Sequence, residues 1–155
     1  MMSLRLIASI LFFSLLAEAA TAEQQQAPLH AGLYDITYSL ELPHLENWAV
    51  DKTTTICVRD PEGFGPPTLP VLSDNTPFAD CVTEHVLFNG ANLTYDIVCS
   101  GRDSAKAHAT YTIAPSAFSG RVAMIMGAKN MTMTEVQVGR RRGSCDLASV
   151  PKNDL

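Results

Sequence analysis

Apolar and polar residues alternate at every second position along most of this chain, and this period limits the possible fold more than any other feature. In residues 33–42, Tyr34, Ile36 and Tyr38 fall on one face of an extended chain, whereas polar residues such as Asp35 fall on the other. A period of two is typical of a β-strand that is buried on one face. No segment after residue 22 shows the apolar spacing of an α-helix of ordinary length. The sequence therefore predicts an all-β protein.

Seven segments are predicted to be strands, from alternation, from β-branched content or from a flanking turn signal, and most of the links between them are short. The segments span residues 33–42, 53–58, 83–88, 93–99, 105–113, 118–126 and 131–138. The clearest link is Asn89-Gly90-Ala91-Asn92, because Asn-Gly between two extended runs is a strong hairpin signal. We therefore expect an antiparallel meander of about seven strands, curled into an open or closed barrel.

One long loop interrupts the meander between the second and third predicted strands. Residues 60–78 contain five prolines and two glycines, which exclude a regular strand or a long helix. A loop of this length inside a compact domain is usually functional or held in place by the rest of the fold.

The N-terminal segment has the features of a secretory signal peptide. Arg5 precedes the apolar run 6–16, which is too short to span a membrane, and Ala20-Thr21-Ala22 fits the cleavage rule for small residues. We predict a signal peptide over residues 1–22 with cleavage after Ala22, and a periplasmic protein without a transmembrane segment. The remaining chain divides into a flexible leader (23–31), a single β domain (32–147) and a C-terminal tail (148–155).

The four cysteines, Cys57, Cys81, Cys99 and Cys145, all follow the predicted signal peptide. An even number of cysteines in an exported chain predicts two disulfides, and there is no Cys-x-x-Cys pattern that would indicate zinc binding or redox activity. Three pairings are possible, and the sequence alone does not choose between them. We prefer Cys57–Cys81, which would tie the base of the long loop, and this leaves Cys99–Cys145.

The net charge argues against nucleic acid as a partner. The full chain has 11 basic and 16 acidic residues, and removal of Arg5 and Glu18 leaves 10 and 15, a net charge of −5. Nucleic-acid binding normally requires a basic surface. The run Arg140-Arg141-Arg142 is the exception, and we interpret it as the solvated end of a strand.

Four of the six methionines gather in ten residues, in the segment MIMGAKNMTM. If the turn lies at Ala128-Lys129, Met126 faces Met131 and Met124 faces Met133, so all four thioethers share one face of the hairpin. The opposite face is also apolar and carries Ala123, Ile125, Val136 and Val138. These two valines suggest that the aliphatic face belongs to the core, but the sequence leaves this open.

The methionine face supports three interpretations. The methionines fill the core or lie beneath the proline-rich loop, they form an adaptable lining for an apolar ligand or partner, or they bind a soft metal such as Cu(I). Trp48 and Phe64, from the two loops, are candidates to cover a ligand on this face.

Catalytic motifs are absent from the sequence, and we predict that the protein is not an enzyme. Glu84 and His85 are adjacent and would point to opposite faces of a strand, and His108 is predicted to be an exposed sheet residue. An enzyme would require Glu84, His85 or His108 to meet another polar group inside a cleft.

The order of short motifs resembles the bacterial exported family catalogued as domain of unknown function 3617, over about residues 32–145. The motifs are Gly32–Thr37, Cys57, Leu69-Pro70, Cys81, Tyr95–Cys99, Ala107–Tyr111, Phe118–Gly120, Met124–Met126, Met131–Met133 and Gly139–Cys145. The resemblance implies a small envelope protein with two cysteine pairs, and it implies no activity. In one departure, His44–Trp48 replaces the Met- or Pro-rich link that family members often have, which weakens the case for a metal.

Together these observations predict a binding module without a cofactor or metal. We expect Met124, Met126, Met131 and Met133, with Trp48 and Phe64, to hold an apolar small molecule, a lipid or an envelope protein. The alternative is a periplasmic copper-binding protein that uses the methionine cluster.

Overall fold

The computed structural model describes residues 29–59, 67–74, 78, 80–101, 104–127 and 131–145. Over these residues the chain forms one antiparallel sheet of seven strands, which confirms the all-β prediction, and the sheet remains open rather than closing into a barrel. The strands are β1 (Gly32–Glu41), β2 (Lys52–Val58), β3 (Val82–Asn89), β4 (Asn92–Val98), β5 (Lys106–Ala114), β6 (Ala117–Ile125) and β7 (Thr132–Gly143). A single 3-10 turn, η1 (Glu46–Trp48), lies between β1 and β2.

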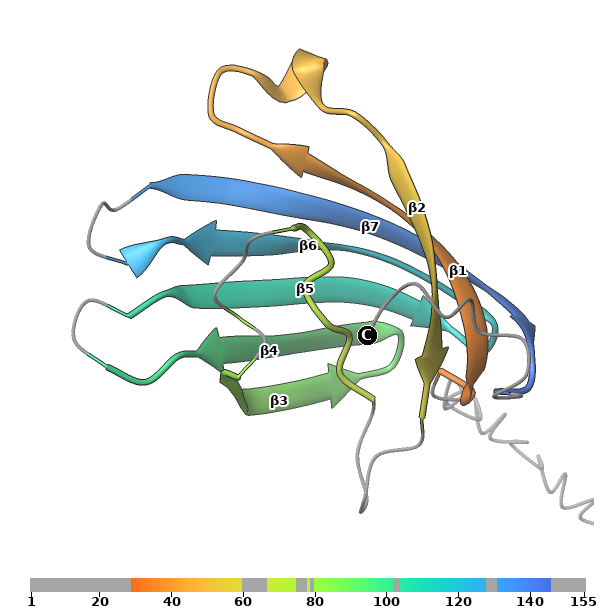
Figure 1. The fold of residues 1–155 in the computed structure, drawn as a ribbon. Helices are drawn as coiled ribbons and strands as arrows, with labels where there is room; N and C mark the ends of the chain where they lie inside the picture. Colours follow the sequence, from red (N-terminus) through yellow and green to blue (C-terminus); the bar gives the residue numbers. More distant parts are fainter. Residues whose placement is uncertain are drawn as a thin grey trace, which may run out of the picture.

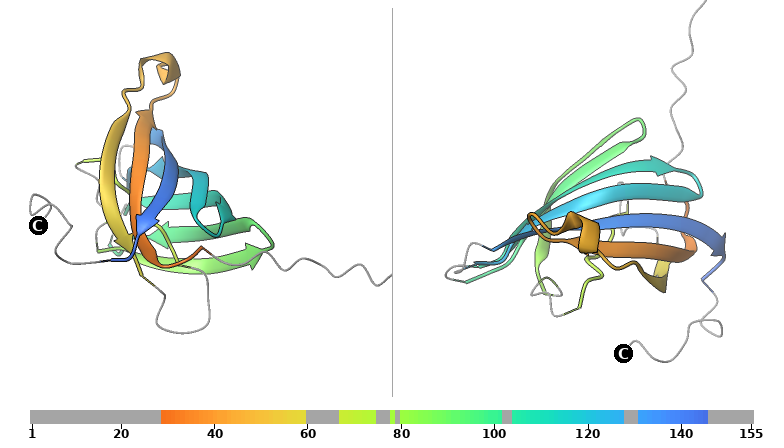
Figure 2. Two further views of the ribbon diagram at one scale, coloured as in Figure 1. Left: turned by 90° about the vertical axis from the view of Figure 1, so that its right-hand side faces the viewer. Right: turned by 90° about the horizontal axis from the view of Figure 1, so that it is seen from above.

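The strand order is β2-β1-β7-β6-β5-β4-β3, so β2 and β3 form opposite edges although they are neighbours in sequence. The chain that links them must therefore cross one whole face of the sheet, and Figure 1 shows it passing in front of the central strands. We call residues 67–74 of this link the strap, and the sheet face beneath it the inner face. The sheet is strongly twisted, and Figure 2 shows β2 and β3 running in steeply crossed directions.

The core lies between the strap and the inner face. Every second residue of the central strands is buried there, and Leu69 of the strap and Phe78 beyond it are buried against them. The buried side chains of the sheet include Tyr34, Ile36, Leu93, Tyr95, Ala107, Ala109, Tyr111, Ile113, Phe118, Val122 and Met124. The alternation predicted for these strands is thereby confirmed.

The strap has no strand neighbour, so side chains of the sheet satisfy its backbone polar groups. Tyr95 Oη donates to the Leu69 carbonyl at 2.6 Å and accepts from the Leu69 N–H at 3.0 Å. The buried carboxylate of Glu135 accepts from the N–H groups of Leu72 at 2.8 Å and Ser73 at 2.6 Å. Gln137 Nε2 donates to the Pro70 carbonyl at 2.8 Å. These bonds fix the proline-rich segment across the inner face.

The disulfides are Cys57–Cys145 and Cys81–Cys99, so the preferred pairing was wrong. That pairing assumed that the two ends of the long loop lie close together. The strand order places them at opposite edges of the sheet instead. Cys57 therefore joins the end of β2 to the residue that follows β7, and Cys81 joins the start of β3 to the end of its hairpin partner β4.

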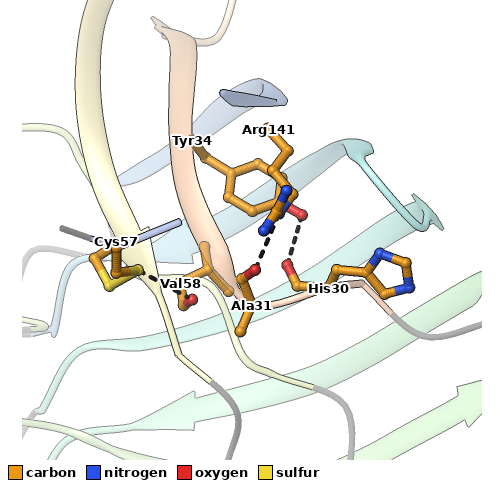
Figure 3. Close-up of a disulfide and its surroundings, with 7 residues drawn as sticks. His30, Ala31, Tyr34, Cys57, Val58 and Arg141 are labelled. Carbon is orange, nitrogen blue, oxygen red and sulfur yellow. Dashed lines mark hydrogen bonds between the residues drawn. A yellow bond between two sulfur atoms is a disulfide. The ribbon is translucent and has the colours of Figure 1, made fainter. Parts of the chain in front are cut away.

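Close to the Cys57–Cys145 disulfide, two side chains hold the segment that leads into β1 (Figure 3). Tyr34 Oη donates to the His30 carbonyl at 2.8 Å, and Arg141 Nε donates to the Ala31 carbonyl at 3.0 Å. Leu29 is buried in the core just before this segment. The disulfide and these two bonds together secure the β2-β1-β7 end of the sheet.

The methionine hairpin has the predicted register. Met124 pairs with Met133, and the Met126 N–H donates to the Met131 carbonyl at 2.8 Å, while the predicted turn at Ala128-Lys129 lies outside the described residues. The suggestion that the aliphatic face is the core was wrong, because Met124 is only 1% exposed whereas Val138 is 46% exposed. The methionine face continues the inner face of the sheet, and the register of β6 and β7 fixes this.

Candidate functional site

The outer face of the sheet carries two rows of side chains that cross β4, β5, β6 and β7. The strand registers align Asp96, His108, Ala123 and Thr134 in one row, and Val98, Lys106, Ile125 and Thr132 in the next. These two rows, together with His85 of β3, line a cavity of about 540 Å³. We call it the outer groove. Its volume lies within the range of small-molecule sites.

The groove is hollow because its middle position is an alanine. Ala123 stands between His108 and Thr134 in its row, and its methyl group leaves the space on either side unfilled. The inner-face residues Met124 and Met133 also border the groove from between the two rows. Apolar groups thus form most of the floor. The ionisable side chains lie toward the β3 side, and Thr132 and Thr134 lie at the β7 side.

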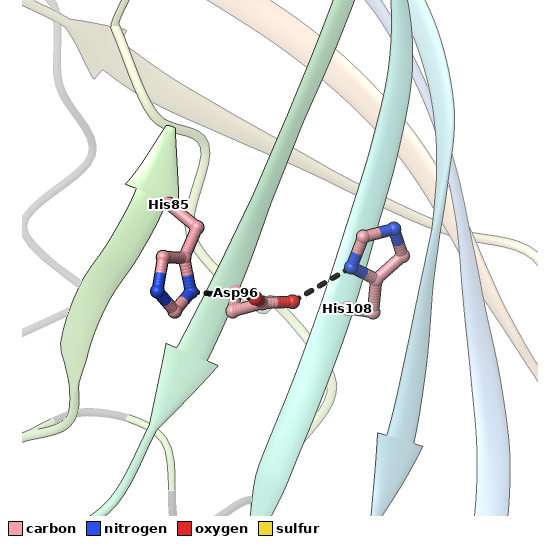
Figure 4. A network of polar contacts seen from close by, with 3 residues as sticks. All are labelled: His85, Asp96 and His108. Carbon is pink, nitrogen blue, oxygen red and sulfur yellow. Dashed lines mark hydrogen bonds and ion pairs between the residues drawn. The ribbon is translucent and has the colours of Figure 1, made fainter. Parts of the chain in front are cut away.

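A carboxylate between two imidazoles forms the polar end of the groove (Figure 4). His85 Nδ1 lies 3.0 Å from Asp96 Oδ2, and His108 Nδ1 lies 2.7 Å from Asp96 Oδ1. The three residues come from β3, β4 and β5, which are neighbours in the sheet. Figure 4 shows the second nitrogen of each ring, Nε2, directed away from Asp96.

A β-bulge in β3 brings His85 to this cluster. The register of β3 on β4 shifts between Glu84 and Leu87, so His85 and Val86 together oppose Tyr95. His85 has φ +52°, a conformation that is rare for residues other than glycine. Glu84 pairs with Asp96, and His85 bonds to the same Asp96, so both residues reach the outer face. The expectation that they point to opposite faces was wrong, because the bulge breaks the alternation.

The electrostatics of the cluster favour an ionised Asp96. Hydrogen bonds from His108 and, to a smaller extent, from His85 lower the pKa of the Asp96 carboxyl group. The side chains of His85 and His108 remain 75% and 58% exposed, so their second nitrogens can reach a ligand or solvent. His108 is exposed as predicted. His85 and His108 both contact another polar group, Asp96, in a cleft, which is the arrangement that an enzyme was expected to require.

Comparison with known protein families identifies the family to which the chain belongs. The family model described as "Protein of unknown function (DUF3617)" matches residues 29–145, which include all seven strands and all four cysteines. The chain belongs to the DUF3617 family. No curated protein and no solved structure matches the chain. The family description states no activity, so the function of this DUF3617 domain must be argued from its geometry.

The predicted methionine site is only partly accessible in this DUF3617 domain. Met124 is buried in the core, Met126 and Met133 are half-buried and pack against it, and Met131 is 49% exposed. The four residues do share a face, as predicted, but that face is the inner one. Met124 and Met133 reach the outer groove only as part of its floor.

Of the two aromatic residues predicted to cover a ligand, the structure describes only Trp48. Trp48 is 80% exposed at the tip of the β1–β2 link, in a turn without buried residues, and Leu45 and Val50 beside it are also exposed. Figures 1 and 2 show this link projecting beyond the ends of the strands. Phe64 lies outside the described residues.

Sequence reasoning missed Asp96 and the role of Ala123. Asp96 lies on the polar side of a predicted strand, opposite His108, and this pairing follows from counting back along β4 and β5 from the link between them. The contribution of His85 had no such signal, because a bulge has no fixed sequence signature at this position. Ala123 was noted only as one of several apolar residues.

Two further features bear on ligands and membranes. Among the described residues, no group of three or more His, Cys, Asp or Glu side chains is arranged to hold a metal ion. Within the same part of the chain, no helix is both long enough and apolar enough to cross a membrane. The predicted signal peptide lies outside the described residues.

Proposed function

We propose that this DUF3617 domain is an exported, non-enzymatic binding module that holds a small apolar ligand in the outer groove. The observation that carries the proposal is the cavity of about 540 Å³ on an otherwise regular sheet face, open at Ala123 and floored by apolar groups. Ligand sites are typically concave and mostly apolar, with a few polar groups that fix orientation. His85, Asp96 and His108 supply those polar groups.

Binding is favoured over catalysis by the chemistry of the lining. Among the described residues that line the groove, the only hydroxyl groups are those of Thr132 and Thr134, and neither a serine nor a cysteine is present. Both imidazoles are largely exposed, so water screens their interaction with Asp96. A nucleophile activated by an adjacent base, as covalent catalysis requires, is therefore not assembled at this site.

Copper binding through the methionines remains the second candidate. The paired register of the hairpin supports a shared thioether face, and thioethers select Cu(I). Burial of Met124 leaves at most the other three sulfurs accessible. Stoichiometric Cu(I) binding that is lost in a Met126→Leu, Met131→Leu variant would rank copper first.

The proposal is tested by filling the groove. N-phenyl-1-naphthylamine, an apolar dye that fluoresces when it leaves water, is titrated into the mature, oxidised protein. Ala123→Phe places a ring in the hollow middle of the groove, and we expect dye affinity to fall at least about tenfold. Ala123 is exposed, so the larger side chain does not overfill the core.

Thr110→Phe is the matched control. Thr110 lies on the same face, one row away on β5, and does not line the groove. Its substitution adds a comparable ring and should leave dye affinity unchanged. Equal affinity in the wild-type protein and Ala123→Phe would reject the outer groove as the ligand site.

A further inference from the structure

The polar end of the outer groove restricts which apolar ligand fits, and this inference rests on the proposed function. Asp96 has two hydrogen-bond partners, His85 Nδ1 at 3.0 Å and His108 Nδ1 at 2.7 Å. An ionised carboxylate only accepts hydrogen bonds, so each Nδ1 must carry the proton. In a neutral imidazole the other nitrogen, Nε2, is then a hydrogen-bond acceptor.

In that tautomer both Nε2 atoms are acceptors, and they remain available to a ligand. Both are directed away from Asp96 in Figure 4, and both rings are more than half exposed. Asp96 contributes further acceptor sites because a carboxylate has about four lone pairs. The threonine hydroxyls of the groove can donate or accept. Lys106 is the one lining side chain that only donates.

The charges at this end of the groove also sum to a negative value. Asp96 lies opposite Glu84 across the β3–β4 pair, and Lys106 is one row away on β5. Glu41, at the far end of the Asp96 row beyond Thr134, is ion-paired with Arg121 and adds no net charge. With neutral imidazoles, Asp96 and the neighbouring Glu84, which does not itself line the groove, outnumber the ammonium group of Lys106, and this favours a cationic ligand over an anionic one.

We propose that the outer groove binds an amphiphile whose head group donates hydrogen bonds, a primary alkylammonium above all, with the head at His85, Asp96 and His108. The apolar tail then runs over Ala123 and Ile125 toward Thr132, along the direction of the two rows. The head meets acceptors and negative charge, and the tail meets the apolar floor. A carboxylate head would face the lone pairs of two imidazoles and a carboxylate.

The same ammonium chemistry has two sources, a free alkylamine or the head group of an aminophospholipid. The bulge in β3 that brings His85 to Asp96 is consistent with a recognition role for this end of the sheet. Bulges occur beside functional sites, where they redirect a side chain, and a non-glycine residue at positive φ is retained only where its surroundings enforce it.

The experiment compares ligands that differ only in their heads. Decylamine, decanol and decanoate are titrated by calorimetry into the mature, oxidised protein at neutral pH, each below its micelle concentration. We expect decylamine to bind at least about tenfold more tightly than decanoate, with decanol between them. Short-chain lysophosphatidylethanolamine is the fourth titrant. Affinity equal to that of decylamine assigns the ammonium to an aminophospholipid, and clearly weaker binding assigns it to a free alkylamine.

Asp96→Asn removes the charge at almost constant shape, and we expect the preference for decylamine over decanoate to fall at least about tenfold. Asp35→Asn is the control, because Asp35 lies on the outer face of β1, away from the groove, where it pairs with Arg142. Equal affinity for all four ligands, or a preference for decanoate, would overturn the head-group inference and leave the apolar groove intact. Absence of binding by every ligand would instead reject the proposed function.

Discussion

At the scale of single residues, burial in the core raises the pKa values of three tyrosines on the inner face. Burial raises the pKa of Tyr95 to about 12 and that of Tyr111 well above its ordinary value, and burial also raises the pKa of Tyr34. Tyr95 is held between the strap and the sheet by two hydrogen bonds to Leu69. The hydroxyl group of Tyr111 donates to Gln137 Oε1 at 3.0 Å. Tyr95 thus bonds the strap directly, and Tyr111 bonds Gln137, which itself donates to the Pro70 carbonyl of the strap.

This burial predicts a loss of stability at high pH. An unfolded chain releases its phenolic protons near pH 10, whereas folded Tyr95 retains its proton to about pH 12. Above about pH 10 the folded state therefore binds more protons than the unfolded state, and the free energy of unfolding falls as the pH rises. We expect phenolate absorbance to appear together with the loss of circular dichroism. A separate, earlier ionisation of three tyrosines in the folded protein would contradict this assignment.

Among the elements, the β3–β4 hairpin contains one β-bulge that determines both the Cys81–Cys99 pairing and the contact between His85 and Asp96. The hairpin signal at Asn89-Gly90 correctly predicts the turn, and Asn89 pairs with Asn92. Continued without interruption, that register would place Cys99 opposite Val82. The bulge inserts one residue into β3, so that Val82 pairs with Val98 and Cys81 lies opposite Cys99. The same bulge directs His85 toward Asp96.

The β6–β7 pair depends on a glycine for its close approach to an aromatic ring. A Cβ atom at Gly139 would lie 2.2 Å from Phe118 Cε1 and 2.3 Å from its Cζ, because the ring covers the glycine on the inner face. Phe118 is buried and contacts Tyr34 and Tyr111, with ring centroids 5.8 Å from each; its ring is tilted against Tyr34 and edge-to-face with Tyr111. The ring therefore has little room to move.

We predict that Gly139→Ala destabilises the domain by about 1–3 kcal/mol, the usual cost of overfilling a packed core. Chemical denaturation followed by circular dichroism measures this change. Gly143→Ala, at the end of the same strand, is the control, because a Cβ atom there meets nothing within 4 Å. It should change the free energy of unfolding by less than about 0.5 kcal/mol. Equal effects of the two substitutions would disprove the close-packing argument.

At the scale of the whole molecule, the strand order determines what each disulfide contributes. Cys57–Cys145 joins residues separated by 88 positions, and Cys81–Cys99 joins residues separated by 18. In the chain-entropy model, a cross-link restricts the unfolded chain more when it closes a longer loop. The first disulfide thus links segments near the start and the end of the domain, whereas the second closes one hairpin.

We expect replacement of both cysteines of Cys57–Cys145 by serine to lower the free energy of unfolding by about 4–5 kcal/mol, and replacement of the Cys81–Cys99 pair to lower it by about 3 kcal/mol. Denaturant titration of the two double variants gives the comparison. A larger loss on removal of Cys81–Cys99 would show that strap and hairpin packing, rather than loop closure, determines the contribution of each bridge.

Much of the fold follows from the sequence alone, because local chemistry determines it. Side-chain alternation and β-branched content locate most of the strands. The Asn-Gly turn sets the β3–β4 link, and the spacing of the methionines predicts the Met124–Met133 pair. These features depend on residues that are close in sequence, and the period of two assigns each side chain to a face. The motif order likewise identified the DUF3617 family before any comparison of structures.

Tertiary structure alone decided the features that depend on long-range placement. The pairing of β1 with β7 puts β2 and β3 at opposite edges, which sends the strap across the inner face and separates Cys57 from Cys81. That crossing makes the methionine side of the sheet the core, although both faces of the hairpin are apolar. The bulge then completes the outer groove by bringing His85 to Asp96. Local patterns do not specify these contacts, because each depends on which distant strands become neighbours.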